Sequence, residues 1–159
     1  HRKRVRALIL SNTRAGADTG EGRANRDAMI DTVKVDGPAA VAEILVPKLL
    51  GPSSLEAMPK VVDHLRTMIS NTPAAGVIGA LEAMRDRSDS TELCKKIDVP
   101  TLVIAGANDQ IVSPAEAGEM ADLIPGAQFA IIPEAGHLAP LEQPIACNRV
   151  IGEFVESLR

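Results

Sequence analysis

Aromatic side chains are almost absent from this sequence of 159 residues, which contains two phenylalanines, no tyrosine and no tryptophan. Proteins that bind single-stranded nucleic acids stack the bases on aromatic side chains, so the composition argues against that function. The formal net charge of −4 gives no attraction to a polyanion either. One short basic cluster, His1–Arg4 with Arg6, has the character of a solvated chain end. We therefore expect no nucleic-acid partner.

Cysteines and long apolar runs are scarce as well. The two cysteines, Cys94 and Cys147, lie too far apart for the short spacings of a metal site or of a disulfide framework. No apolar run approaches the roughly 20 residues that cross a bilayer, and the charged first residues do not resemble a secretory signal. These absences predict free thiols in a reducing compartment, no metal, no membrane partner and a cytoplasmic location.

Three short apolar runs have the length and composition of β-strands. Continuous apolar runs are typical of strands that are buried on both faces, as in parallel sheets. With 45% hydrophobic residues, the chain has enough apolar material for a core around such a sheet. The predicted strands are Val5–Leu10, Thr101–Gly106 and Ala127–Ile132.

Helices are predicted to flank these strands. After the second run, Ser113 and Pro114 are the residue types that favour a helix N-cap and first turn, and strand, helix, strand is by default a right-handed parallel crossover. A last helix over Gln143–Leu158 is expected to pack on the sheet. The residues expected to face the core are Ala117, Met120, Ala121 and Ile124 in the first helix, and Ile145, Ala146, Val150, Ile151, Phe154 and Val155 in the last.

Residues 15–94 have helical periodicity and no strand-like alternation. The spacing of Ser53 and Glu56 indicates a capping box, Pro59 is expected to bend or delay that helix, and Thr72–Pro73 is expected to begin another. The sequence thus divides into a first core strand with its exit loop (1–14), a helical insertion (15–94) and a C-terminal α/β core (95–159).

Polar residues with catalytic potential follow two of the strands. Asp109 comes just after the second strand, and His137 follows the third, behind a glycine that leaves room for a tight turn. Loops at the carboxyl ends of parallel strands share one edge of a sheet, where a carboxylate can orient an imidazole that acts as a general base. Each residue alone would be an ordinary loop residue, but their joint placement favours a catalytic pair. His64, inside a helical pattern, is interpreted as a surface or packing residue.

Five motifs surround this pair, in the order Ile97–Asp109, Val112–Pro114, Ile124–Ala127, Ile132–Leu138 and Glu142–Pro144. In order, spacing and residue type they are similar to the C-terminal part of the α/β-hydrolase family, and most similar to its esterase and 3-oxoadipate enol-lactonase branch. The resemblance implies an α/β fold with about three parallel strands, flanking helices and a helical lid formed by residues 15–94. It also implies that Asp109 is the triad acid and His137 the triad base, with no cofactor.

The nucleophile of that family is missing from the sequence. The family places it in a G-x-S-x-G elbow, and none of the eight serines here has glycine both two residues before and two after it. Ser11 lies at a strand exit, but no helix is predicted to start there, and neither cysteine is a credible substitute. The chain therefore resembles the lid and C-terminal part of a serine hydrolase for small carboxylic esters or lactones, and alone it is expected to be inactive.

Two alternatives stay open from the sequence. The chain could be a non-catalytic interaction or assembly module on the same scaffold, or part of a dehalogenase or haloperoxidase relative with the same acid and histidine. In the family that the chain resembles, the strand corresponding to Val5–Leu10 pairs with the strand that bears the nucleophile. Because that strand is missing from the sequence, the resemblance implies that an apolar parallel edge is left open. We expect a second copy, giving a homo-oligomer, a complementing N-terminal half, or a rearranged lid to cover that edge.

Overall fold

The computed structural model describes residues 2–159, so His1 of the basic cluster lies outside the described residues. The chain divides into two compact units. The first, here called the sheet unit, comprises the chain up to Ala15 together with Lys48–Ser54 and Thr91–Arg159. The second, here called the helical unit, comprises Gly16–Pro47 and Leu55–Ser90. The predicted three-part division stays a prediction; the two units differ from it in placing Ala15, Lys48–Ser54 and residues 91–94 with the sheet.

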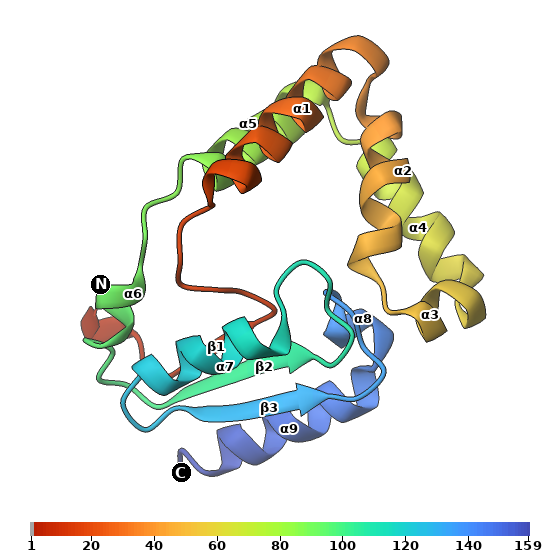
Figure 1. Cartoon of the computed structure of the whole chain (residues 1–159). Helices are drawn as coiled ribbons and strands as arrows, with labels where there is room; N and C mark the ends of the chain where they lie inside the picture. Colours follow the sequence, from red (N-terminus) through yellow and green to blue (C-terminus); the bar gives the residue numbers. More distant parts are fainter. Residues whose placement is uncertain (1) are drawn as a thin grey trace. The chain divides into compact units, whose positions relative to one another are not determined.

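The sheet unit is built on three parallel strands in the order β1-β2-β3 (Figure 1). The strands are β1 (Leu8–Ser11), β2 (Thr101–Gly106) and β3 (Gln128–Ile132). The predicted parallel sheet is thereby confirmed, and the bounds of β2 are the predicted ones. β1 begins at Leu8 rather than Val5, because β2 begins opposite Leu8, at Thr101.

The prediction that the strands are buried on both faces is confirmed for β2 and wrong for β1 and β3. Every residue of β2 is buried, whereas Ile9 of β1 and both Phe129 and Ile131 of β3 are 41–49% exposed. β1 and β3 are the two edges of this three-stranded sheet, so each has a neighbour on one side only. An apolar run in the sequence predicts a strand but does not distinguish a central strand from an edge.

Two helices cover opposite faces of the sheet, α7 (Pro114–Leu123) and α9 (Pro144–Glu156) (Figure 1). Alternate residues of a strand point to opposite faces, so Val103 packs in the core beside α7 and Leu102 in the core beside α9. The sheet unit also contains a short 3₁₀-helix, Arg2–Arg4, and the short helices α6 (Thr91–Cys94) and α8 (Ala139–Glu142).

The prediction for α7 is confirmed and that for α9 is partly wrong. Ser113 caps α7, and the four predicted core residues of that helix are buried. In α9 the buried residues are Cys147 and Phe154, whereas Ile145 is 87% and Val155 is 45% exposed. Each helical residue turns by about 100°, so Ile145 projects from nearly the opposite side of α9 from Cys147.

The helical unit draws on five helices of the chain. Its core contains Ile30, Val33, Val41 and Leu81, and a salt bridge of 2.7 Å joins Arg85 to Asp27. The helices are α1 (Gly20–Asp36), α2 (Pro38–Leu49), α3 (Pro52–Ala57), α4 (Pro59–Ser70) and α5 (Ala74–Arg85); the end of α2 and the start of α3 belong to the sheet unit.

Helices begin close to both predicted starts, α3 at Pro52 and α5 at Ala74, but the predicted capping contacts are wrong. Ser53 lies inside α3, and its hydroxyl donates to Glu134 instead of capping a helix (3.4 Å). Pro59 does not merely bend a helix: α3 ends and α4 begins there, since proline suits a first turn and lacks the N–H that a helix interior needs. The hydroxyl of Thr72 donates back to the carbonyl of Met68, so Thr72 is not the cap of α5.

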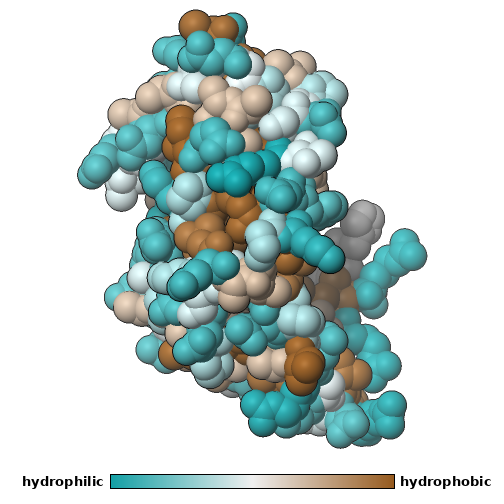
Figure 2. Space-filling view, turned by 90° about the vertical axis from the view of Figure 1, so that its right-hand side faces the viewer, coloured by the Kyte–Doolittle hydropathy of each residue, from teal (hydrophilic) through white to brown (hydrophobic). Residues whose placement is uncertain are grey.

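Figure 2 shows apolar side chains interspersed with polar ones on the face that it presents. Within residues 2–159, no helix combines the length and the apolar character needed to cross a bilayer.

Candidate active site

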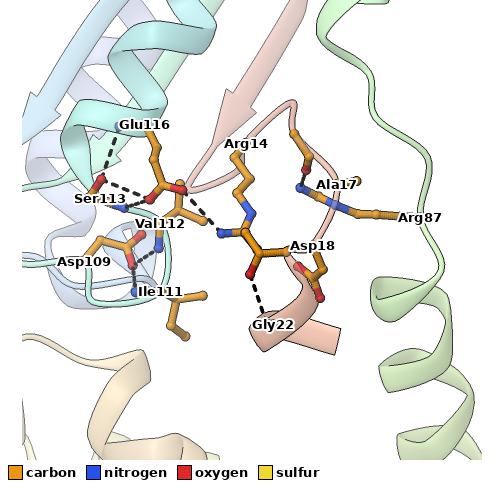
Figure 3. A network of polar contacts seen from close by, with 12 residues as sticks. Arg14, Ala17, Asp18, Gly22, Arg87, Asp109, Ile111, Val112, Ser113 and Glu116 are labelled. Carbon is orange, nitrogen blue, oxygen red and sulfur yellow. Dashed lines mark hydrogen bonds and ion pairs between the residues drawn. The ribbon is translucent and has the colours of Figure 1, made fainter. Parts of the chain in front are cut away.

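Asp109 lies in the loop after β2, with a fully buried side chain. Its backbone N–H donates to the carbonyl of Gly106, which makes a turn directly at the end of the strand (3.2 Å). Its Oδ1 then accepts from the backbone N–H groups of Ile111 (2.8 Å) and Val112 (3.0 Å) (Figure 3). The carboxylate is therefore held by its own loop, with Oδ2 left for other partners.

His137 is that other partner. Its Nδ1 lies 2.9 Å from Oδ2 of Asp109, and its side chain keeps 22% of its surface exposed. The backbone N–H of His137 donates to the carbonyl of Leu49 (3.0 Å), which anchors the loop after β3. The structure thus brings together the two residues selected from the sequence. Because Nδ1 is engaged in the hydrogen bond with Asp109, Nε2 is the ring nitrogen available to take or release a proton.

The surroundings of Asp109 favour its charged form. Burial raises the pKa of this carboxyl group, but the hydrogen bonds from His137, Val112, Asn12 and Ile111 outweigh burial and hold the pKa below its usual value. A charged carboxylate at this distance fixes the tautomer of an imidazole and stabilises the imidazolium that forms when the ring takes a proton.

Two glycines let the loops approach each other closely. A Cβ on Gly106 would lie 2.5 Å from the carbonyl oxygen of Ala135 and closer still to that of Gly136, and a Cβ on Gly136 would lie 2.7 Å from the carbonyl carbon of Leu50. The explanation of Gly136 by a tight turn is wrong: the left-handed backbone conformation belongs to Glu134, with φ of 57°. Gly136 is required because another backbone passes against it.

Glu142 supports the loop that carries His137, a role that the sequence did not predict. Its side chain is buried, and its two oxygens accept from the backbone N–H groups of Gly136 (2.8 Å) and Gly51 (2.7 Å). The carboxylate thus bridges the residue before His137 to Gly51, which is 91 positions from Glu142 in the sequence. Only the position of Glu142 six residues after Gly136, in the next helix, could have drawn attention to it.

Asn12 is the second residue that sequence reasoning missed. It follows β1, and its Nδ2 donates to Oδ2 of Asp109 (3.1 Å) and to the carbonyl of Gly136 (3.2 Å). Its place at the exit of a parallel strand, on the same edge as Asp109 and His137, was the available signal. Ser11, weighed as a nucleophile, donates its hydroxyl to Oδ1 of Asn12 (2.8 Å).

A second polar cluster holds the far end of the Asp109 loop (Figure 3). Glu116 closes a capping box with Ser113, and Nη1 of Arg14 lies 3.3 Å from its Oε1. Burial raises the pKa of Glu116, but the bonds from Ser113 and Arg14 outweigh it, so the pKa is lowered. The loop is therefore fixed both at Asp109 and at the start of α7.

The cysteines take no part in this site. Cys94 and Cys147 are buried and neither forms a disulfide. Burial, followed by the negative charge of Glu142, raises the pKa of the Cys147 thiol, which keeps it neutral and poorly nucleophilic. Among the residues that the structure describes, no three His, Cys, Asp or Glu side chains are grouped so that they could hold a metal ion.

A parallel sheet that carries an acid and a histidine at the exits of neighbouring strands is the arrangement of one large class of hydrolytic folds. The model of the family described as alpha/beta hydrolase fold matches residues 1–144. The chain therefore belongs to the α/β-hydrolase family.

Several of the proteins that it resembles are esterases or enol-lactonases. The chain is similar to 3-oxoadipate enol-lactonase 2 of Acinetobacter baylyi, at 28% identity over 94% of the chain and 54% of the relative. It superimposes on a thermophilic esterase from Thermogutta terrifontis with a TM-score of 0.93 and 39% identity, over 99% of the chain and 58% of the esterase. It superimposes on the enol-lactonase of Burkholderia xenovorans with a TM-score of 0.89 and 26% identity, over 98% of the chain and 58% of the enol-lactonase. The chain thus spans about half the length of the relatives it matches.

We expect Glu142→Gln to destabilise the sheet unit. The amide nitrogen of glutamine would face a backbone N–H that now donates to a carboxylate oxygen, leaving a buried donor unpaired at a cost of about 1–3 kcal/mol. Urea denaturation of the variant and of Glu153→Gln, which alters an exposed residue of α9, measures the effect. Equal stability of the two variants would contradict the bridging role of Glu142.

The depressed pKa of Asp109 predicts a pH-dependent contribution to stability. An aspartate in an unfolded chain has a pKa of about 3.9. Because the folded pKa is lower, the charged carboxylate stabilises the fold above about pH 3.9, and this contribution disappears as the pH falls through the folded pKa. The free energy of unfolding lost in Asp109→Asn should therefore shrink on acidification, as measured by urea denaturation between neutral and acidic pH. Asp122→Asn, at an exposed position of α7, is the control and should show no such trend.

Proposed function

We propose that this chain contributes the acid and the base of a serine hydrolase that acts on small carboxylic esters or lactones. The observation that carries the proposal is the 2.9 Å bond between Asp109 and His137, formed by a buried carboxylate and a partly exposed imidazole. Membership of the α/β-hydrolase family and the likeness to esterases and enol-lactonases support the class of substrate. Neither Cys94 nor Cys147 forms a disulfide, which agrees with the reducing, cytoplasmic setting that we propose for the chain.

The proposed reaction is acyl transfer to a serine and then to water. Nε2 of His137 takes the proton of the serine hydroxyl as its oxygen bonds to the carbonyl carbon, and then gives that proton to the departing alkoxide. In the second half, Nε2 takes a proton from water as the new C–O bond forms, and returns it to the serine when the acyl–serine bond breaks. Asp109 keeps the imidazole oriented and stabilises its positive charge throughout.

The serine itself is proposed to come from residues other than these 159. No G-x-S-x-G elbow occurs in the sequence, and the chain spans about half the length of its relatives. A histidine with its acid but no nucleophile cannot form an acyl-enzyme, so the isolated chain should not hydrolyse esters.

A complementation assay tests this proposal. The chain is incubated with p-nitrophenyl acetate, alone and with a separately expressed N-terminal fragment of a family member that carries the serine elbow. We expect hydrolysis at the level of the buffer from the chain alone, and hydrolysis above it from the mixture. His137→Ala should abolish the gain, because the general base is lost.

The controls separate this function from its rivals. His64→Ala changes a histidine outside the site and should keep the gain. Hydrolysis by the chain alone would contradict the missing nucleophile, and a gain that survives His137→Ala would contradict the role of His137. If every pairing is inert while the two parts still associate, the chain is an assembly module and the catalytic proposal is wrong.

We further propose that the free edge of β1 receives another parallel strand, from a second copy or from a complementing N-terminal part. Leu8 and Asn12 donate toward β2, to the carbonyls of Pro100 (3.0 Å) and Ile104 (2.8 Å). Alternate residues of a parallel strand direct their backbone groups to opposite sides, so Ile9 and Ser11 direct theirs away from β2. An open row of such groups beside an exposed isoleucine is a template for strand pairing.

Ile9→Pro should weaken this association without breaking the sheet. Proline removes an N–H that faces away from β2 and leaves the β1–β2 bonds intact. Size-exclusion chromatography over a range of concentrations should show larger species for the wild-type chain and a shift toward monomer for the variant. Ile131→Pro makes the same change at the outer edge of β3 and should leave the profile unchanged. A wild-type chain that stays monomeric at every concentration would contradict pairing with a second copy.

A further inference from the structure

Asn12 lies where the exits of all three strands meet. Its side chain is buried, and its single amide nitrogen reaches two acceptors on two different loops: Oδ2 of Asp109 after β2 (3.1 Å) and the carbonyl of Gly136 after β3 (3.2 Å). Gly136 immediately precedes His137. One amide group therefore spans the distance between the acid and the loop that carries the histidine.

The chemistry of its partners fixes the orientation of this amide. A charged carboxylate and a backbone carbonyl can only accept hydrogen bonds, so the NH₂ group must face Asp109 and Gly136. The opposite side of the amide agrees, because Oδ1 of Asn12 accepts from the hydroxyl of Ser11 (2.8 Å). Every polar atom of the side chain is thereby paired, which is the condition for burying an amide without a net cost.

The backbone of Asn12 is also adapted to this position. Its φ is 51°, in the left-handed region that asparagine tolerates better than most residues. Its N–H still donates to Ile104 (2.8 Å), so the residue ends the pairing of β1 with β2 and turns its side chain toward the site in the same step.

We propose that Asn12 is a positioning residue that holds the side chains of Asp109 and His137 in their mutual orientation. Two donors hold each oxygen of Asp109: Ile111 and Val112 on Oδ1, and His137 and Asn12 on Oδ2. Without Asn12 the carboxylate can rotate about its bond to Cβ, and the carbonyl next to His137 loses its partner. The contribution to catalysis rests on the proposed function, whereas the positioning itself can be measured in the chain alone.

Nuclear magnetic resonance of the proton on Nδ1 of His137 provides that measurement. The chain has three histidines, so ¹⁵N-histidine labelling gives few signals, and His64→Gln and His137→Gln assign them. We expect a downfield, slowly exchanging proton in the wild type. Asn12→Gly, which suits the left-handed backbone, should make its exchange with water about tenfold faster, the effect of losing one hydrogen bond to a charged group. Asn71→Gly removes the same side chain at an exposed helix end and should leave the exchange rate unchanged.

A second variant keeps the shape of the side chain. Asn12→Asp replaces the NH₂ donor with an oxygen that repels Asp109, and should raise the pKa of Asp109, followed by ¹³C NMR of its carboxyl carbon. If Asn12→Gly does not fold, Asn12→Asp alone tests the positioning role of Asn12. An unchanged proton exchange rate together with an unchanged Asp109 pKa in the folded variants would overturn the proposal, as would the absence of a protected Nδ1 proton in the wild type. In the complemented enzyme, Asn12→Gly should lower kcat about tenfold with little change in KM; inactivity of the complemented wild type would instead contradict the proposed function.

Discussion

The buried charge of Asp109 is the constraint on which the rest of the site depends. Taking an ion of this kind out of water costs several kcal/mol even after the protein relaxes, so the fold must supply donors from every side. It does so with two backbone N–H groups of one loop, an imidazole and an amide. These donors follow three different strands, so one carboxylate holds together the exits of β1, β2 and β3.

The parts of the structure that follow from local patterns could be predicted from the sequence. The bounds of β2, the serine cap of α7 and the pairing of Asp109 with His137 depend on apolar runs, cap residues and the geometry of parallel strands. The strand-exit position of Asn12 was a signal, but its contact with Asp109, 97 residues away, could not be predicted from it. The same holds for the contact of Glu142 with Gly51, 91 residues away. The exposure of Ile145 was missed because an apolar residue in a helix does not reveal which side of that helix meets the sheet.

The two buried carboxylates of the site have different tasks. Asp109 binds the imidazole that takes and releases a proton in the proposed reaction. Glu142 binds only backbone N–H groups, which never titrate, and therefore acts as a fixed support for the loop around Gly136. Burial, and after it the charge of Glu142, raises the pKa of the neighbouring Cys147 thiol, and this cysteine packs in the core. Asp109 therefore takes part in the proposed chemistry, whereas Glu142 stabilises the loop that carries His137.

The segment Lys48–Ser54 limits how the helical unit of this chain can be exchanged for another. It lies between two stretches of the helical unit, yet it belongs to the sheet unit, where the carbonyl of Leu49 accepts from both His137 and Leu138. A recombination event or a designed graft that replaced residues 16–90 in one piece would remove this segment and, with it, the support of the histidine loop. Exchange of the helices is compatible with an intact site only if the seven residues stay in place and the new sequence is inserted on each side of them.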